Sequence, residues 1–124
     1  MFLISIISAA FALTAASSSK ADFGHKKVVD GSLRTAWSED VGGSGENEWF
    51  ELKLVKATQI DTISIWPGNL SRGTKSYNQY SRPRTVKIEL DGKVTIEAFR
   101  FQDIPKRVDV PINSTGRTIK ITII

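Results

Sequence analysis

The strongest constraint on the fold of this 124-residue chain is the alternation of apolar and polar residues in several short runs. From Trp49 to Val55, the side chains of Phe50, Leu52 and Leu54 share one face, and the residues between them are polar. A two-residue repeat of this kind predicts a half-buried β-strand. Further predicted strands are Gln59–Trp66, Thr85–Leu90, Lys93–Phe101, Arg107–Ile112 and Arg117–Ile124, with Thr14–Lys20 as a candidate edge strand.

Turn residues separate these runs. Asp91-Gly92 is a strong signal for a two-residue β-hairpin, while Gly42-Gly43-Ser44-Gly45 and the polar stretch Pro67–Pro83 are predicted loops. After the N-terminal segment, no run has a sustained helical period that would supply the crossover helices of a parallel sheet. We therefore predict an all-β, antiparallel sandwich.

The N-terminal residues differ in character from the rest. Phe2–Ala12 is apolar or small and ends in Ala10-Phe11-Ala12, which matches the A-x-A cleavage pattern of secretory signals. The run is too short for a transmembrane helix, and it lacks the basic residues that usually precede such a signal. We predict that residues 1–12 are a signal-peptide-like segment of an exported protein. The alternative is a buried strand or helix of a longer protein whose start is misassigned.

Composition narrows the function classes. The absence of cysteine excludes disulfides, thiolate zinc sites and cysteine nucleophiles, and the single histidine, His25, excludes a multi-histidine metal centre. The net charge of +4 favours anionic partners but falls short of a nucleic-acid-binding signature. Glu46, Glu48 and Glu51 are explained as solvated charges on a glycine-rich rim and a strand face, so catalysis is not expected.

A second Asp-Gly turn, Asp30-Gly31, precedes Thr35 and Trp37. Glycine allows the chain to reverse tightly there. The oxygens of Asp30 and Thr35 can bond to amides of the same loop or ligate a hard cation. Trp37 and Trp49 are large enough to anchor a small core, so both are expected to be buried.

Several of these motifs together resemble the opening of a discoidin domain, the coagulation factor 5/8 type C or galactose-binding-like jelly roll. The resemblance rests on Ser17-Ser18-Ser19, Val29-Asp30-Gly31, Thr35-Ala36-Trp37 and Glu48-Trp49-Phe50-Glu51-Leu52. One bacterial branch, the translocation domain associated with streptococcal NAD glycohydrolase, is similar in its later motifs. These are the glycine-rich insert, Ile65-Trp66-Pro67-Gly68-Asn69, Tyr77, Tyr80, Ser81-Arg82-Pro83-Arg84 and Val86.

The resemblance implies a jelly-roll β-sandwich over residues 13–124 that lacks the family's last strand, so the C-terminus is expected to be truncated. It also implies a binding module without chemistry of its own and without a required cofactor. Many discoidin domains hold a structural calcium ion, and Asp30 and Thr35 match positions of that site. Ser32 departs from the pattern, since many relatives have a second aspartate there, and the acidic ligand of the last strand is absent.

The predicted loop Pro67–Pro83, between the predicted strands Gln59–Trp66 and Thr85–Leu90, is the candidate binding surface. No acidic residue lies between Asp61 and Glu89, whereas basic, amide and aromatic side chains are interleaved there. Aromatic faces suit sugar rings, and arginine forks suit carboxylate, sulfate or phosphate. The alternative is a solvated loop with its aromatic residues packed beneath it. The predicted ligand-binding residues are Trp66, Asn69, Tyr77, Tyr80, Arg82 and Arg84.

The predicted function is an exported, non-catalytic module that recognises a glycan or a cell-surface partner through residues 66–84. Its expected location is secreted, periplasmic or at the cell surface, with no transmembrane segment and no nucleic-acid partner. One alternative is a structural or protein-interaction domain of a larger secreted protein. Another is an enzyme fragment whose missing chain carries catalysis.

Overall fold

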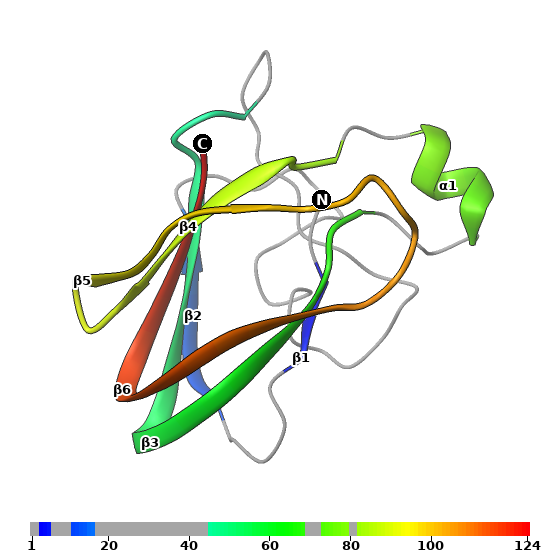
Figure 1. Ribbon diagram of the computed structural model, residues 1–124. Helices are drawn as coiled ribbons and strands as arrows, with labels where there is room; N and C mark the ends of the chain where they lie inside the picture. The colour runs from blue at the N-terminus through cyan, green and yellow to red at the C-terminus, as the bar shows by residue number, and fades with distance from the viewer. Residues whose placement is uncertain (1–2, 6–10, 17–44, 69–72, 80–81) are drawn as a thin grey trace.

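The computed structural model describes residues 3–5, 11–16, 45–68, 73–79 and 82–124 of the chain. Antiparallel strands pair in the order β1-β3-β6-β4-β5, and β2 also pairs with β3 (Figure 1). The prediction of an all-β antiparallel fold is confirmed. A six-residue helix, α1, lies in the connection that was predicted as a polar loop. The elements are β1 (Leu3–Ser5), β2 (Phe11–Ala16), β3 (Trp49–Trp66), α1 (Thr74–Gln79), β4 (Thr85–Leu90), β5 (Lys93–Arg100) and β6 (Val108–Ile123).

Strands β3 and β6 are long and bent, and together they form both layers of the fold. They pair along Trp49–Lys53 of β3 and again along Thr58–Ile65. Figure 1 shows each strand turning sharply at the lower left, so that its two halves run in different layers. The first layer adds β2, β4 and β5, and the second adds β1. The two layers are therefore continuous through two strands of the chain.

The sequence predicted two separate strands in place of each of these long ones, and this was wrong. The register between β3 and β6 shifts between Lys53 and Thr58, and again between Ile60 and Thr62. Extra residues of this kind bend a strand without ending its pairing. The strands predicted separately as Trp49–Val55 and Gln59–Trp66 are the two halves of β3. Those predicted as Arg107–Ile112 and Arg117–Ile124 are the two halves of β6.

Specific contacts stabilise the bend. The Nε of Arg117 donates a hydrogen bond of 2.9 Å to the carbonyl of Leu54, which satisfies a backbone acceptor where the ladder is interrupted. Gly116 is buried, and a Cβ at this position would lie 2.5 Å from Cγ of Leu90. Strand β6 can therefore pass the end of β4 this closely only with glycine at position 116.

The hydrophobic core lies between the two layers. Most side chains that the alternation pointed inward are buried, including Ile63 and Ile65. The run Lys93–Phe101 differs, since Val94 is 49% exposed and Ala98 is exposed as well, while Phe101 is buried after β5. Burial of these aliphatic and aromatic groups is the main favourable term for folding. The core consists of Phe50, Leu52, Leu54, Ile60, Ile63, Ile65, Val86, Ile88, Leu90, Phe101, Val110, Ile112, Ile119, Ile121 and Ile123.

The predicted hairpin at Asp91-Gly92 is confirmed between β4 and β5. Both residues have positive φ, 52° and 78°, which is the conformation of a two-residue type I′ turn. The Asp91 carboxylate accepts hydrogen bonds of 3.0 and 2.9 Å from the backbone amides of Arg117 and Thr118. The bond from Thr118, then that from Arg117, lowers the pKa of Asp91. The hairpin is thus fastened to β6 close to the bend.

The N-terminal strands pair with β3. Leu3–Ser5 pairs with its end, and Phe11–Ala16 pairs with its beginning. The edge strand predicted from Thr14 therefore begins earlier, at Phe11. The signal-peptide-like segment 1–12 and the domain boundary at residue 13 stay predictions. Among the described residues, no helix has the length and apolar character that a membrane span needs.

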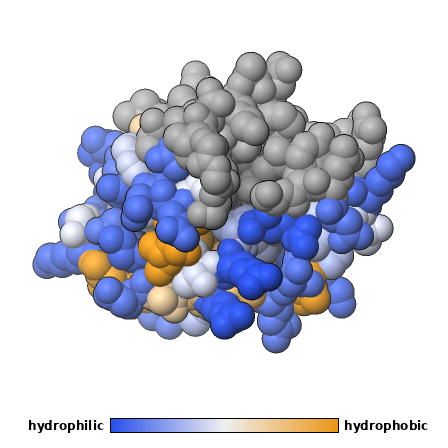
Figure 2. Space-filling model, turned by 90° about the horizontal axis from the view of Figure 1, so that it is seen from above, coloured by the Kyte–Doolittle hydropathy of each residue, from blue (hydrophilic) through white to orange (hydrophobic). Residues whose placement is uncertain are grey.

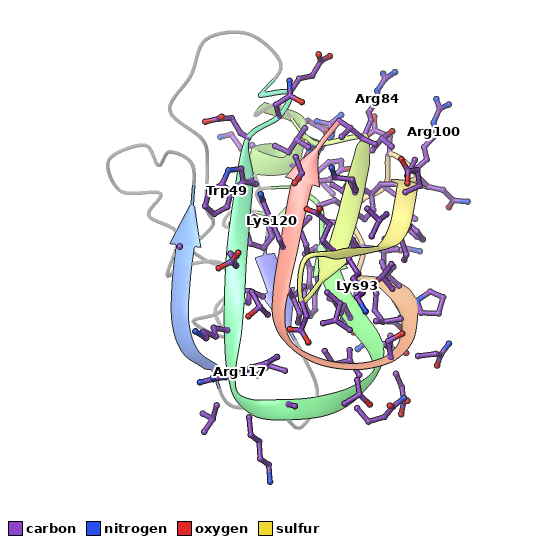
Figure 3. All side chains as sticks on the ribbon, turned by 90° about the vertical axis from the view of Figure 1, so that its left-hand side faces the viewer. Trp49, Arg84, Lys93, Arg100, Arg117 and Lys120 are labelled. Carbon is purple, nitrogen blue, oxygen red and sulfur yellow. The ribbon has the colours of Figure 1, made fainter. Side chains whose placement is uncertain are left out.

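The two tryptophans expected in the core have different outcomes. Trp49 is only half-buried, and the Nζ of Lys120 lies 4.7 Å from the centre of its ring. Figure 3 shows the side chains of Trp49 and Lys120 near each other on the first layer. The prediction that Trp49 anchors the core was wrong, because Phe50 takes the inward position of the alternation instead. Trp37 lies outside the described residues.

Candidate functional site: a cleft beside helix α1

A cleft of about 230 Å³ lies where α1, the segment before β4 and the segment after β5 meet. Figure 1 shows these three segments near one another at the upper side of the molecule. Figure 2 looks onto that side, and its described surface is mostly hydrophilic, with small separate apolar patches. The cleft is lined by Pro67, Tyr77, Arg82, Pro83, Arg84, Phe101, Gln102 and Asp103.

Tyr77 forms one wall of the cleft. Its amide donates a 3.2 Å hydrogen bond to the carbonyl of Gly73, directly before α1, and Tyr77 is only 4% exposed. Gly68 makes this packing feasible, since a Cβ there would lie 2.7 Å from the ring. The backbone of Gly68 also has a φ of +152°, a conformation that residues other than glycine rarely adopt. The ring is therefore held against the backbone at the end of β3.

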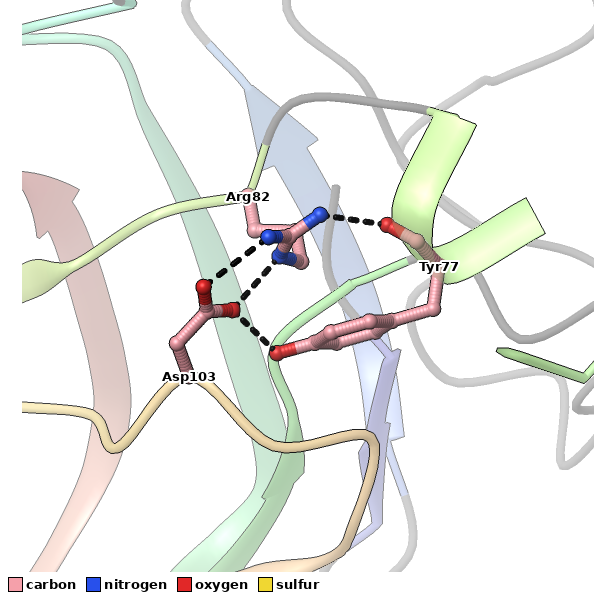
Figure 4. A network of polar contacts seen from close by, with 3 residues as sticks. All are labelled: Tyr77, Arg82 and Asp103. Carbon is pink, nitrogen blue, oxygen red and sulfur yellow. Dashed lines mark hydrogen bonds and ion pairs between the residues drawn. The ribbon is translucent and has the colours of Figure 1, made fainter. Parts of the chain in front are cut away.

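Arg82 ties α1 to the segment after β5 (Figure 4). Its Nε and Nη2 donate to the two carboxylate oxygens of Asp103 at 2.8 and 3.0 Å, in a bidentate ion pair. Its Nη1 donates to the carbonyl of Tyr77 at 2.6 Å, and its guanidinium carbon lies 4.3 Å from the centre of the Tyr77 ring. Planar, forked donors make such simultaneous contacts possible for arginine and not for lysine.

The hydroxyl of Tyr77 completes the network by donating to Oδ1 of Asp103 at 2.7 Å. Burial first, and then this bond, raise the pKa of Tyr77 to about 12. Hydrogen bonds from Arg82, and then from Tyr77, lower the pKa of Asp103 to about 2. The bond to Asp103 raises the pKa of Arg82. At neutral pH the three groups therefore stay a neutral phenol, a carboxylate and a guanidinium.

These three residues are suited to fixing the geometry of the cleft wall and not to proton transfer. A general acid or base works best with a pKa near the working pH, and those of Tyr77 and Asp103 are moved away from neutrality. Both carboxylate oxygens and the phenol proton are already engaged within the network. We call Tyr77, Arg82 and Asp103 the rim network, because they fix one side of the cleft.

A second hollow of about 510 Å³ adjoins the cleft and shares four of its lining residues. The residue it adds is Arg100, the last residue of β5, which is exposed. Phe101 lies in both hollows and is itself buried in the core. The hollow is lined by Arg84, Arg100, Phe101, Gln102 and Asp103.

The predicted ligand-binding residues divide into three groups. Tyr77, Arg82 and Arg84 line the cleft together. Trp66 ends β3 and is half-buried, but it does not line the cleft. Asn69 and Tyr80 lie outside the described residues. Binding by any of the six stays a prediction.

The predicted calcium ligands, Asp30 and Thr35, also lie outside the described residues. Within the part of the chain that the structure describes, no three histidine, aspartate or glutamate side chains gather to hold a metal ion. The calcium site therefore stays a prediction from the resemblance alone.

Sequence reasoning missed the residues at the end of β5 and directly after it. Arg100, Gln102 and Asp103 line the two hollows but were not singled out. Asp103 lies 21 residues after Arg82, its ion-pair partner, and no local spacing links the two. Phe101 gave no usable signal either, because in the run Lys93–Phe101 it falls on the opposite face from the alternating Val94, Ile96 and Ala98.

Solved structures share this fold. The family 32 carbohydrate-binding module of C. perfringens NanJ, solved in complex with galactose, has a TM-score of 0.69 and 18% identity, and the match covers 90% of this chain and 81% of that one. A pectin-binding carbohydrate-binding module has a TM-score of 0.70 and 20% identity, with 93% and 79% covered. A truncated AlyQ with CBM32 and alginate lyase domains has a TM-score of 0.66 and 18% identity, with 98% and 29% covered.

These likenesses confirm the jelly-roll β-sandwich, and at such identities they show the fold alone. No curated protein matches the sequence significantly. A family model, described as the NAD glycohydrolase translocation F5/8 type C domain, matches residues 5–124. The discoidin-like resemblance of the sequence is thereby confirmed, and the chain belongs to the NAD glycohydrolase translocation F5/8 type C domain family.

Proposed function

We propose that this domain is an exported, non-catalytic module that binds a glycan or a glycan-bearing cell-surface partner through the cleft and the adjoining residues 66–84. The observation that carries the proposal is a polar cleft with arginine and amide side chains at its surface and an aromatic residue in its wall. Sugar sites combine such groups, because hydroxyls need polar partners while ring faces need apolar ones. The galactose and pectin ligands named for two modules of the same fold support this class of ligand.

The lining residues have different roles in this proposal. Arg84 and Gln102 are exposed and offer donors to a ligand. Tyr77 and Arg82 position the wall, because their polar groups are used within the rim network. Trp66, Asn69 and Tyr80 extend the proposed surface from the predicted loop. Side chains that are already held in place in the free protein lower the entropy cost of binding a ligand.

A protein-interaction or structural domain of a larger secreted protein is the second candidate. The inward packing of Tyr77 favours it, since two of the predicted contact residues already serve the fold. The family description, which names a translocation domain, also favours a place beside a catalytic NAD glycohydrolase domain. In this case the activity would reside elsewhere, and the location would be that of a secreted bacterial toxin.

A glycan-array screen of the folded domain, with and without calcium, tests the first candidate. The informative variant is Arg84→Ala, because Arg84 lines the cleft but donates none of the hydrogen bonds of the rim network. The matched control is Lys93→Ala, an exposed cation at the opposite end of β5 (Figure 3). Tyr80→Ala probes the predicted loop in the same screen.

Specific binding that is lost in Arg84→Ala and kept in Lys93→Ala supports the module and locates its site. If the folded domain binds no glycan, the proposal is contradicted and the protein-interaction function becomes the better account. A structural calcium ion at Asp30 and Thr35 predicts a higher melting temperature in calcium than in chelator.

A further inference from the structure

Two arginines project from neighbouring positions at one end of the first layer. Arg84 directly precedes β4, and its carbonyl accepts a 2.8 Å hydrogen bond from the amide of Phe101. Arg100 ends β5 and is the cross-strand partner of Thr85. Figure 3 shows both side chains extending from the same corner of the molecule. The β4–β5 pairing therefore keeps the bases of the two side chains close together.

The hollow between these arginines continues the cleft. Arg84, Phe101, Gln102 and Asp103 line both spaces, and Arg100 lines only the second one. Phe101 contributes an apolar wall, and Phe99 packs edge-on against it with ring centres 5.3 Å apart. A ligand longer than one sugar ring could therefore reach from the cleft into the hollow while contacting the same wall.

The charges of this region are unbalanced. Its one carboxylate, Asp103, is already paired with Arg82 through bonds of 2.8 and 3.0 Å, and it also accepts a bond from the Tyr77 hydroxyl. Arg84 acts on Asp103 only through space, and this is the weakest influence on its pKa. Among the described residues, neither Arg84 nor Arg100 has an ion-pair partner. Three arginines and one aspartate leave the two hollows with a net charge of +2.

We infer that the hollow between Arg84 and Arg100 binds the acidic group of an acidic glycan, either a carboxylate or a sulfate, while the adjoining cleft takes the neutral part of the same chain. This inference rests on the proposed glycan-binding function and names its ligand class. Guanidinium forks bind planar carboxylates and sulfate oxygens through paired hydrogen bonds. Gln102 can add a neutral donor to the same group.

The experiment compares glycans that differ only in charge. An oligogalacturonate carries carboxylates, and its carboxyl-reduced form is the neutral match. A keratan sulfate oligosaccharide carries sulfates without uronic acid, and its desulfated form is again the neutral match. Titration calorimetry of the full chain is expected to show at least one acidic member binding roughly tenfold more tightly than its neutral counterpart, the effect of one charge-assisted interaction.

Three variants separate fork geometry from general charge. The double variant Arg84→Gln/Arg100→Gln is expected to lose the roughly tenfold preference, so that it binds the acidic glycan no more tightly than the neutral one. Arg84→Lys/Arg100→Lys keeps the charge but not the fork, so it is expected to lose most of the preference as well. Lys56→Gln/Lys93→Gln changes the net charge equally, at exposed positions that line neither hollow, and is expected to keep the preference.

The outcomes distinguish this inference from the function on which it rests. Equal affinity for acidic and neutral glycans, or a preference that the two arginine variants retain, would overturn the acidic-group site while leaving glycan binding in place. An equal loss in the Lys56→Gln/Lys93→Gln control would also overturn it, because net charge alone would then explain the effect. No binding of any glycan by the folded chain would overturn both.

Discussion

At the scale of single residues, Arg82 serves the fold and lines the cleft at once. It pairs with Asp103 through two hydrogen bonds, donates to the carbonyl of Tyr77 and lies over the Tyr77 ring. If Arg82 served binding alone, Arg82→Ala would leave stability nearly intact. These four contacts argue for the opposite result.

We expect Arg82→Ala to reduce the free energy of unfolding by about 2 kcal/mol, because it removes a bidentate pair, a backbone contact and a cation–π contact together. Tyr77→Phe should cost about 1 kcal/mol, since it removes one hydrogen bond and keeps the buried ring. Urea denaturation followed by tryptophan fluorescence measures both. An unchanged midpoint in Arg82→Ala would show that the rim network adds nothing to stability.

The rim network also predicts how stability changes with pH. Because the pKa of Asp103 is lowered from 3.8 to about 2 in the folded state, its contribution is present above pH 3.8 and is lost as the pH falls toward 2. Because the pKa of Tyr77 is raised from 10.0 to about 12, its contribution is present below pH 10 and is lost as the pH rises toward 12.

Melting temperatures across pH test these two windows. The stability advantage of the wild type over Asp103→Asn should disappear in the acidic window, and its advantage over Tyr77→Phe should shrink in the alkaline one. Lys93→Gln, which lies away from the network, should follow the wild-type profile at both ends. Parallel profiles for all four proteins would contradict the assigned contacts.

Part of the candidate site was predictable from sequence, for a physical reason. A long polar stretch without acidic residues, on a rigid β scaffold, marked the surface to which Tyr77, Arg82 and Arg84 belong. Asp103 and Arg100 were not predictable, because the pairing of β4 with β5 brings Asp103 to the cleft and Arg100 to the adjoining hollow. A single sequence carries no signal for such a long-range meeting.

At the scale of elements, each long strand was predicted as two because the inward-facing positions change from even to odd partway along it. The buried apolar residues of β3 occupy even positions up to Ile60 and odd positions from Ile63 onward. In β6 the phase changes between Ile112 and Ile119. A bulge moves every later side chain to the other face. The alternation therefore assigned the faces of each half correctly but could not show that the halves are one strand.

Gly116→Ala tests the tight crossing at the bend of β6. Its Cβ would lie 2.5 Å from Leu90 Cγ and 2.9 Å from Oδ2 of Asp91, so we expect a loss of about 1–3 kcal/mol from overpacking. Gly92→Asn is the control, because its position has φ +78° but no neighbouring atom within 4 Å, and asparagine tolerates that conformation. It should leave thermal stability nearly unchanged.

The double variant Gly116→Ala/Leu90→Ala identifies the cause. If the Leu90 side chain is the obstacle, the double variant should be less destabilised than the sum of the two single variants. Additive losses would mean that the backbone at Gly116, and not its contact with Leu90, carries the effect. Chemical denaturation of the four proteins gives the comparison.

At the scale of the whole molecule, the two layers cannot unfold independently. Strands β3 and β6 run through both, and one core lies between them. Ile63 and Val110 lie in the second layer, and Leu52 and Ile121 lie in the first. All four are fully buried in the same cluster. The cleft is built on this shared framework, since Phe101 belongs both to the core and to its lining.

We expect Ile63→Ala, a change in the second layer, to reduce global stability by about 2–5 kcal/mol. The free energy of hydrogen exchange at the amides of Leu52 and Ile121, which lie in the first layer, should fall by the same amount. Val55→Ala is the control, because Val55 lies at the bend and is 58% exposed; it should leave these amides nearly unchanged. Exchange measured by NMR under EX2 conditions tests the coupling. Protection that falls only in the second layer would show that the bend is a hinge between two separately folding halves, and the single cooperative core inferred from the continuous strands would then be wrong.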